Sequence, residues 1–403
     1  MPRITKYHAI YLSLANYLHY TKQCGYPSKV SPAASPRRAV VYDSCLTFGY
    51  DKCYQLRSCP HLSQKGLTMK AAVVTGKGTI AVEDVPVPRA TEGEVVVRVA
   101  CCGICGSDVR LLADGFFPVG LIPGHEFSGV ISEIGPGVDG WEAGDRVTAL
   151  PDLTCGRCYY CLHGQQHHCP GLEIVGVSAG LPGAFAEYVK LKATMLHRIP
   201  EGVTDREAAS VEPCAVSLRA VRLSGIQAGE TAIVYGAGAI GLFALQAARL
   251  AGARAVYVVE PARNRARAAA ALGADGVFDP ESNATADIQR LTGVGADVAY
   301  VCTAAPPVLQ QAVDSVKKMG TVMMVGGGGS ATVVPELWMW REVQVRGSFG
   351  YLDEFPMALD LFSQKRINID GMISAAVPLG GIQQAFEDLA QPNSQIKVLV
   401  QPD

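Results

Sequence analysis

The stretch that decides the fold runs from Thr231 to Gly241 and reads TAIVYGAGAIG. An apolar run typical of a buried strand leads into Gly236, Gly238 and Gly241, which have the spacing G-x-G-x-x-G. At this spacing the first glycine makes a turn, the second lets the backbone approach a pyrophosphate, and the third allows a helix to pack closely on the strand. The stretch therefore predicts a dinucleotide-binding loop, although glycines that serve packing alone would give the same pattern.

The residues after the loop indicate which dinucleotide it would take. Residues 239–250 have a helical pattern, so Ala239 and Ile240 lie at a helix N-terminus, where free N–H groups and the helix dipole favour phosphate. Glu260 ends the next strand, where a carboxylate would accept hydrogen bonds from ribose hydroxyls and would repel a 2′-phosphate. Arg265 follows closely and would favour such a phosphate. We expect NAD(H) to be favoured over NADP(H).

Working outward, the chain divides into regions with different patterns. From about 224 to 350, strand and helix patterns alternate, which implies parallel strands with crossover helices. From 69 to about 200, short β-rich runs are separated by turns, which suggests an antiparallel barrel or sandwich. Residues 351–403 carry two helical patterns and a last strand. The elements expected outside the dinucleotide loop include strands at 94–99, 127–134, 146–150, 255–259 and 396–400, and helices at 355–362 and 385–389.

The first 68 residues differ from the rest. They hold eight of the 15 tyrosines and carry nine Lys/Arg against two Asp/Glu, with no sustained helical or strand period. Met69 then begins a clean strand, as the start of a domain would. We expect residues 1–68 to be a disordered extension that precedes the working start of the protein. Their acid-poor composition also permits an organellar transit peptide.

Composition narrows the class of protein. The chain has 403 residues, of which 49% are hydrophobic and 18% charged, and such a length usually divides into two domains. A net charge of −2 without a basic stripe argues against nucleic acid as the partner. The longest apolar stretch, residues 232–245, is interrupted by three glycines and is too short to span a bilayer. We expect a cytoplasmic protein that acts on a small molecule and binds no membrane.

Four cysteines, Cys155, Cys158, Cys161 and Cys169, have the spacing C-x2-C-x2-C-x7-C. Four thiolates in one short loop can converge on a tetrahedral zinc ion, and such a closed site is structural because it leaves no position for a substrate. Disulfides or free thiols are the alternatives, and the lack of a secretory signal peptide favours metal. Three nearby histidines are spare candidate ligands: His163, His167 and His168.

A second set of residues has the composition of a catalytic zinc site, which needs three protein ligands and an open position. The candidates are Cys105, His125 and Glu212, with Glu126 beside the histidine. A single histidine in an apolar run is more often part of the core, but the adjacent acid and the upstream cysteine favour a ligand. Asp108 could accept the other N–H of the imidazole and so fix its tautomer.

Residues 69–403 resemble the zinc-containing medium-chain dehydrogenase/reductase family, and within it the polyol and 2,3-butanediol dehydrogenase branch. The resemblance rests on the two metal-like sets, the glycine loop and three short strings: Gly103 to Asp108, Gly124 to Phe127, and Gly144 to Val147. It implies a GroES-like β-rich catalytic domain at 69–223, with the structural zinc lobe. It also implies a Rossmann domain at 224–350 and a tail, 351–403, that returns to the catalytic domain. The implied assembly is a homodimer or homotetramer.

The same resemblance implies an activity and assigns roles. The activity would be reversible NAD(P)-dependent oxidation of an alcohol to a ketone or aldehyde, with two zinc ions per chain. Cys105, His125 and Glu212 would bind the catalytic zinc, and Glu126 would be a neighbouring or transient ligand. Ser107 would hydrogen-bond the substrate oxygen and begin the exit of its proton. Glu212 is followed by Pro213, and other alcohol dehydrogenases of the family have a cysteine ligand where this chain has Glu212. This difference indicates the polyol-type branch.

Two departures from the family pattern bear on function. Many relatives have a histidine three residues after the relay serine, but here that residue is Arg110, whose guanidinium cannot pass a proton on. Sorbitol-type enzymes have an arginine where this chain has Gly350, which favours a smaller secondary alcohol, vicinal diol or hydroxyketone over a long sugar alcohol. A threonine- or sugar-specific dehydrogenase remains an alternative. A non-catalytic, zinc-stabilised nucleotide-binding protein is the alternative from another class.

Overall fold

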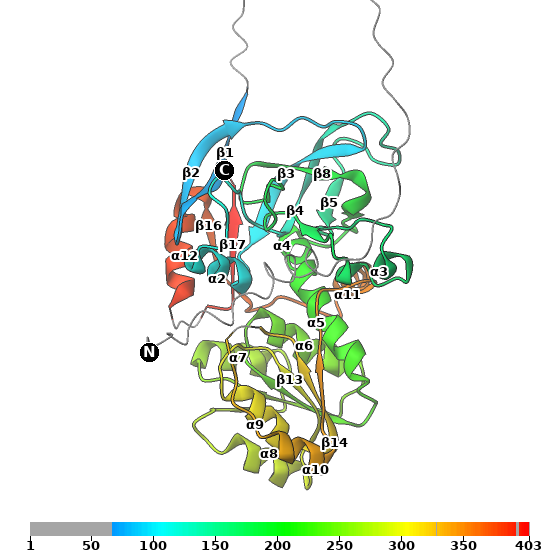
Figure 1. Ribbon diagram of the computed structural model, residues 1–403, viewed down its shortest axis with the longest axis vertical. Coiled ribbons are helices and arrows are strands. Elements are labelled where there is room, and N and C mark those ends of the chain that lie inside the picture. Colours follow the sequence, from blue (N-terminus) through cyan, green and yellow to red (C-terminus); the bar gives the residue numbers. More distant parts are fainter. Residues whose placement is uncertain (1–66, 328, 392–394, 403) are drawn as a thin grey trace, which may run out of the picture.

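Figure 1 shows a computed structural model of the chain, in which residues 67–327, 329–391 and 395–402 are described. The two large β-sheets form separate parts of the molecule, joined by the helix α5 (Val211–Ser224). The prediction that the N-terminal extension is disordered concerns residues almost all of which lie outside the described ranges. No helix in the described ranges is long and apolar enough to cross a membrane.

The first of these sheets is parallel throughout, with the strand order β12-β11-β10-β13-β14-β15. Its order reverses between β10 and β13, so the carboxyl ends of these strands border a crevice, the place where open α/β sheets bind ligands. Its strands are β10 (Thr231–Tyr235), β11 (Ala255–Val259), β12 (Gly276–Phe278), β13 (Ala296–Val301), β14 (Val316–Met324) and β15 (Gln344–Gly347). The helices between them are α6 (Ala239–Leu250), α7 (Arg263–Ala271), α8 (Ala284–Thr292), α9 (Val308–Ser315) and α10 (Pro335–Arg341).

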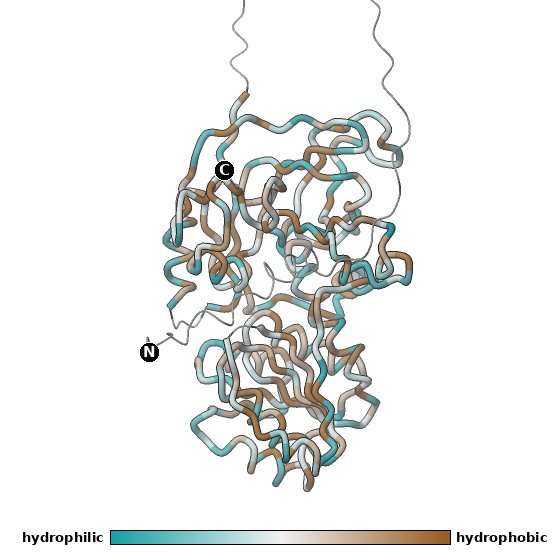
Figure 2. The backbone as a smooth tube through the Cα atoms, in the orientation of Figure 1, coloured by the Kyte–Doolittle hydropathy of each residue, from teal (hydrophilic) through white to brown (hydrophobic). Residues whose placement is uncertain are grey.

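Every residue of the central strand β10 is buried, because helices cover both faces of the parallel sheet. Ala232 and Val234 of β10 pack into one core with α5 and α6, whereas Ile233 and Tyr235 pack into a second core with α8 and α9. Alternate residues of a strand point to opposite faces, so the continuous apolar run encodes a strand buried on both sides. Figure 2 shows these strands as hydrophobic segments in the interior of the lower part.

The second large sheet has seven strands, in the order β16-β17-β3-β4-β5-β9 with β8 also paired to β3. All its pairs are antiparallel except β16 with β17. Its strands are β3 (Glu94–Gly103), β4 (Glu126–Ile134), β5 (Arg146–Ala149), β8 (Tyr188–Lys192), β9 (Leu196–Arg198), β16 (Ile373–Pro378) and β17 (Lys397–Gln401). The remaining elements are β1 (Thr68–Gly76), β2 (Thr79–Pro86), β6 (Asp152–Leu153), β7 (Glu173–Ile174), α2 (Gly106–Asp114), α3 (Tyr159–Leu162), η1 (Gln166–His168), η2 (Ala193–Met195), α4 (Asp205–Ala209), α11 (Glu354–Ser363), η3 (Leu379–Gly381) and α12 (Ile382–Ala390).

The end of the chain completes the antiparallel sheet. Strand β17 inserts between β16 and β3, so that Leu399 pairs with Gly103 and Val400 with Cys102. In Figure 1 the red strand β17 lies beside the cyan β3. The last strand therefore lies against the residues that immediately precede Cys105. The α/β fold class, with a GroES-like part and a Rossmann-type parallel sheet, is confirmed.

Candidate metal centre and cofactor crevice

Three of the predicted ligands come together in the antiparallel part. Cys105 precedes α2 at the end of β3, and His125 and Glu126 stand at the start of β4, the strand that pairs with β3. One ligand atom from each of Cys105, His125 and Glu126 lies within 4.8 Å of the other two. Because Gly103 pairs directly with Glu126, the sheet register itself brings the thiol to the imidazole and the carboxylate.

A glycine shapes the turn that presents His125. Gly124 has φ of +102°, and a Cβ added there would lie 2.9 Å from both Cys102 Sγ and Phe185 N. Neither the backbone conformation nor the space admits a larger residue. The tight turn leaves the imidazole of His125 buried, with only 6% of the residue exposed.

Asp108 contacts the imidazole of His125 at Nδ1. Its Oδ1 lies 3.3 Å from His125 Nδ1, and its Oδ2 accepts a hydrogen bond from the backbone N–H of Cys105 at 3.0 Å. Burial lowers the pKa of His125, but the charges and hydrogen bonds of Asp108 and Cys105 together outweigh burial, so the pKa lies well above the usual value. The contact of Nδ1 with Asp108 leaves Nε2 as the nitrogen available to a metal.

Glu126 has the features expected of a metal ligand. Its residue is 1% exposed, and its Oε2 accepts a hydrogen bond from Lys397 Nζ at 2.6 Å. Its Oε1 is buried and has no hydrogen-bond partner within the described ranges. A buried, unpaired carboxylate oxygen is costly unless something else binds it. A thiolate, an imidazole and this oxygen are ligand types that zinc takes, so the residues fit a zinc ion.

The structure places Glu212 near the centre but outside this trio. Glu212 lies in the first turn of α5 and interacts electrostatically with His125, Glu126 and Lys397. Although part of the residue reaches solvent, desolvation of its carboxyl raises its pKa to about 7. Its carboxyl group also interacts with the buried Tyr351. Its expected role as third zinc ligand stays a prediction.

The residues of the expected proton route lie on α2. Ser107 Oγ donates a hydrogen bond to Cys105 Sγ at 3.1 Å, so its hydroxyl lies at the centre. Arg110, one turn further on, donates from Nη1 to the backbone carbonyl of Gly327, in the loop after β14. Arg110 thus reaches from the antiparallel part to the carboxyl ends of the parallel strands, and the metal centre lies next to the crevice.

The four cysteines of the second site also converge. Their sulfur atoms lie within 4.8 Å of one another, and the cysteines of the described ranges form no disulfides. Cys169 Sγ accepts hydrogen bonds from the backbone N–H groups of Cys155 and Gly171 at 3.4 and 3.3 Å. A backbone hydrogen bond from Arg157 lowers the pKa of Cys155 to about 6. Such N–H donors stabilise thiolates, which suits a zinc site made of four cysteines, and the spare histidines are not among its ligands.

The glycine loop has the predicted position at the head of the crevice. Gly236 follows β10 with φ of +93°, and Gly238 precedes α6, whose first residues include Ala239, Ile240 and Gly241. Glu260 accepts hydrogen bonds from the backbone N–H groups of Ala237 and Ala262 at 2.7 and 2.9 Å, and so links the loop to the end of β11. These bonds leave lone pairs on each carboxylate oxygen for ribose hydroxyls.

Arg265, by contrast, is already engaged in the structure. Its guanidinium donates from Nε and Nη2 to the backbone carbonyl of Gln395, at 3.0 and 2.7 Å. The contact joins α7 to the segment before β17. A role for Arg265 toward a cofactor phosphate stays a prediction.

Three side chains at the centre have no signal in the sequence. Lys397 lies on β17, 271 residues from the glutamate that it contacts. Tyr351 reaches Glu212 from the segment before α11. Asp152, on β6, interacts with His125, and burial raises its pKa to about 6. None of the three belongs to a local motif, so only the folded chain reveals them.

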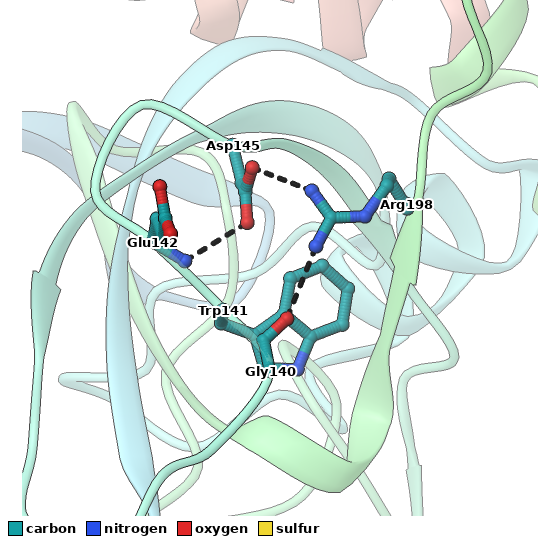
Figure 3. Close-up of a pocket in the computed structure, with 5 residues that line it drawn as sticks. All are labelled: Gly140, Trp141, Glu142, Asp145 and Arg198. Carbon is teal, nitrogen blue, oxygen red and sulfur yellow. Dashed lines mark hydrogen bonds and ion pairs between the residues drawn. The ribbon is translucent and has the colours of Figure 1, made fainter.

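A separate surface pocket of about 370 Å³ lies away from this centre and is lined by Gly140, Trp141, Glu142, Asp145 and Arg198. Figure 3 shows Arg198 bonded to Asp145 and to the backbone carbonyl of Gly140, and Asp145 bonded to the backbone N–H of Glu142. Arg198 pairs with Asp145 at 2.5 Å, donates to the carbonyl of Gly140 at 3.1 Å and lies 4.7 Å from the centre of the Trp141 ring. The pocket contains none of the predicted ligands or loop glycines, so the metal centre and the crevice remain the candidate functional site.

Comparison with known families and proteins agrees with both halves of the chain. Residues 91–201 match the alcohol dehydrogenase GroES-like domain, and residues 239–364 match the zinc-binding dehydrogenase family. The chain is 35% identical over 354 residues to (R,R)-butanediol dehydrogenase of Bacillus subtilis, covering 83% of this chain and 100% of that one. It is 32% identical over 346 residues to a sorbitol dehydrogenase of the same organism, covering 83% of this chain and 98% of that one.

A solved structure extends the likeness to three dimensions. A zinc-binding dehydrogenase of Sinorhizobium meliloti 1021, bound to NADP, superposes with a TM-score of 0.77 and 34% identity. The match covers 83% of this chain and 100% of that protein. The relatives are therefore matched along their whole lengths.

Proposed function

The chain belongs to the zinc-containing medium-chain dehydrogenase/reductase family, and we propose that it oxidises a secondary alcohol or vicinal diol reversibly to a ketone, with a nicotinamide dinucleotide as hydride acceptor. One observation carries the proposal most directly. Cys105, His125 and Glu126 converge next to a crevice headed by a glycine loop, and the buried Oε1 of Glu126 has no hydrogen-bond partner among the described residues. Metal-ligand and dinucleotide features at one place support hydride transfer and not mere nucleotide binding.

The side chains of this centre would have distinct tasks. A zinc ion bound there would supply Lewis acidity, which makes an alcohol proton easier to remove. Ser107 would accept the hydrogen bond of the substrate hydroxyl and turn its proton toward solvent. Arg110 cannot take up that proton, so the proton would leave through water and the cofactor ribose. Asp108 would keep the imidazole of His125 in one tautomer and orientation.

We propose two zinc ions per chain. Cys105, His125 and Glu212 would hold the catalytic ion, with Glu126 as a further or transient ligand, and the four cysteines would hold a structural one. The short distances among the cysteine sulfurs and within the trio support both sites. The structural ion would leave no position for substrate. Its role would be to keep the lobe that carries the four cysteines, residues 155–169, in one conformation.

NAD(H) is the cofactor that we propose, with Gly236, Gly238, Gly241 and Glu260 as its main contacts. The buried position of Glu260 at the end of β11 supports the choice, because its charge would repel a 2′-phosphate. The relative from S. meliloti was solved with NADP, so the ratio of activities with the two cofactors is the measurement that decides.

For the substrate, we propose a small vicinal diol or secondary alcohol, as the name of the butanediol dehydrogenase relative suggests. Gly350 has φ of +60°, a conformation that disfavours an arginine, and a Cβ there would lie 3.6 Å from Cβ of His167. The chain therefore offers no guanidinium at this position for the outer hydroxyls of a sugar alcohol. A sorbitol- or threonine-type activity is the second candidate, supported by the sorbitol dehydrogenase relatives.

The experiment is a substrate panel with the zinc-loaded enzyme, followed by the absorbance of NADH. Butanediols, sorbitol, threonine and simple secondary alcohols would be compared by kcat/KM. We expect a vicinal diol to exceed sorbitol and threonine. Turnover of none of these substrates, with zinc and cofactor bound, would contradict the proposal.

The assembly and the domain boundaries are proposals of the same kind. We place the catalytic domain at 69–223, the Rossmann domain at 224–350 and the returning tail at 351–403. We also propose a homodimer or homotetramer. Edge strand β15 and the exposed Met339 and Trp340 of α10 would suit contact with a second copy of the chain. Light scattering of the purified protein would give the number of subunits.

A further inference from the structure

A buried lysine enters the metal centre from the far end of the chain. Lys397 is 5% exposed, and its ammonium donates to Glu126 Oε2 at 2.6 Å and to the backbone carbonyl of Ile104 at 3.1 Å. Its position is fixed by the sheet. Its own N–H bonds to the carbonyl of Met372 at 3.1 Å, and the following residue, Val398, accepts the N–H of Ile104 at 2.9 Å. Nothing in the ligand pattern requires a cation here.

Space for this ion pair depends on a residue without a side chain. A Cβ added to Gly103 would lie 2.3 Å from Glu126 Oε2 and 3.3 Å from Lys397 Cδ. Its φ is not positive, so backbone conformation does not explain the glycine. The absence of a side chain at position 103 therefore makes room for the carboxylate of Glu126 and the stem of Lys397.

The ion pair determines which way Glu126 can act. Lys397 holds Oε2 of Glu126. Oε1 of the same carboxylate is buried and has no hydrogen-bond partner within the described ranges. Glu126 is also the residue whose carboxylate lies close to the ligand atoms of Cys105 and His125. With one oxygen held, the carboxylate has a single oxygen free for a metal. The ammonium also interacts electrostatically with Cys105 and Glu212, the other anionic groups of the centre.

We propose that Lys397 is a positioning residue of the metal centre: it holds one oxygen of Glu126, presents the other to the metal, and keeps Glu126 from occupying the position that the substrate needs. The inference rests on the proposed zinc-dependent function. Lys397 touches neither substrate nor cofactor in this role and acts only through Glu126.

Because Lys397 is positively charged, its removal should change metal binding in the direction opposite to that expected for a merely structural residue. A cation beside a metal site repels the metal and competes for its anionic ligand, so removing the cation should strengthen metal binding. A lysine with a purely structural role would give the opposite result, because a loosened centre loses metal faster. The direction of the change in metal release therefore separates the two roles.

The test measures zinc release from the zinc-loaded protein to an excess of a colorimetric chelator. The Cys105→Ser variant identifies the phase that belongs to this centre, because it lacks that phase and keeps the release from the four-cysteine site. In Lys397→Met and Lys397→Gln, we expect that phase to be at least about tenfold slower. Lys397→Arg retains the charge and should release zinc within about threefold of the wild-type rate.

Lys365→Met is the matched control. Lys365 pairs with Glu207 at 2.9 Å, and neither residue belongs to a metal-like set, so its loss should leave zinc release unchanged. Steady-state kinetics supply the second measurement. The KM for the alcohol should rise roughly tenfold in Lys397→Met, which has no donor to hold Glu126, because the freed oxygen of Glu126 competes with the substrate, whereas NADH affinity should not change.

Each outcome has a meaning for the proposal. Faster or unchanged zinc release in Lys397→Gln would overturn it, and so would slow release in Lys397→Arg to the extent seen in Lys397→Gln. If Lys397→Met fails to fold, Lys397→Gln, which loses the charge but keeps a hydrogen-bond donor on the side chain, carries the zinc-release test alone. A wild-type protein that binds no zinc at this centre would instead contradict the proposed function.

Discussion

Two alanine substitutions in the glycine loop should have opposite consequences. A Cβ at Gly241 would lie 1.8 Å from the carbonyl oxygen of Gly236 and 3.3 Å from Val234 Cγ1, whereas a Cβ at Gly238 has no atom within 4 Å. Ordinary contact between non-bonded heavy atoms begins near about 3.5 Å. Gly241→Ala therefore forces α6 away from β10, but Gly238→Ala leaves the packing of the loop unchanged.

The magnitudes follow from these distances. Overpacking of this kind costs about 1–3 kcal/mol of unfolding free energy, and we expect at least that loss for Gly241→Ala. For Gly238→Ala the weaker helix cap and the stiffer unfolded chain offset each other, so the change should stay below about 1 kcal/mol. Its new methyl group would instead occupy the space through which the pyrophosphate approaches, and NADH should bind at least about tenfold more weakly.

The assay pairs urea unfolding, followed by circular dichroism, with fluorescence titration of NADH. Gly380→Ala is the control, because its Cβ would also meet no atom within 4 Å and the residue lies outside the crevice. Wild-type NADH affinity in Gly238→Ala would refute the assignment of this loop to the pyrophosphate. Unchanged stability in Gly241→Ala would refute the packing argument.

Three further predictions concern the cofactor, the lobe and the centre. Glu260→Gln removes the negative charge of the carboxylate that accepts two backbone hydrogen bonds at 2.7 and 2.9 Å. The ratio of kcat/KM for NAD⁺ over that for NADP⁺ should therefore fall at least about tenfold, and an unchanged ratio would disprove the role of Glu260 in cofactor choice. Cys158→Ser should reduce the zinc content from two ions per chain to one and lower the melting temperature, since a structural zinc site contributes folding energy; two ions in the purified variant would rule the lobe out as a metal site. Glu212→Ala should abolish turnover while NADH still binds, and a metal count shows whether the loss is one of zinc; full turnover would exclude Glu212 from the centre.

The parallel sheet could be predicted from the sequence because its signals are local. The strand 231–235, the helix 239–250 and the strand 255–259 have the predicted bounds, since a buried apolar run, a glycine loop and a helical period determine them within a short window. The end of the chain was harder to predict. Strand β16 was not anticipated, because its alternation of half-buried and exposed residues becomes meaningful only once β17 pairs with it.

The candidate site divides in the same way. Each metal-like set contains residues marked by spacing or by a neighbouring glycine, and the structure brings together all four cysteines and three of the four members of the other set. Lys397 and Tyr351 escaped prediction because their contacts are set by sheet pairing and by the docking of α5. The position of Glu212 outside the trio likewise depends on how α5 packs, which no local pattern specifies.

The most direct test of the central claim is a joint measurement of zinc content, NADH binding and turnover in Cys105→Ser. A serine has nearly the same shape but is a poor zinc ligand, so the variant should retain one zinc ion per chain, bind NADH with wild-type affinity and reduce no NAD⁺ with a vicinal diol. Wild-type turnover by Cys105→Ser protein that has lost the zinc of this centre would contradict the account.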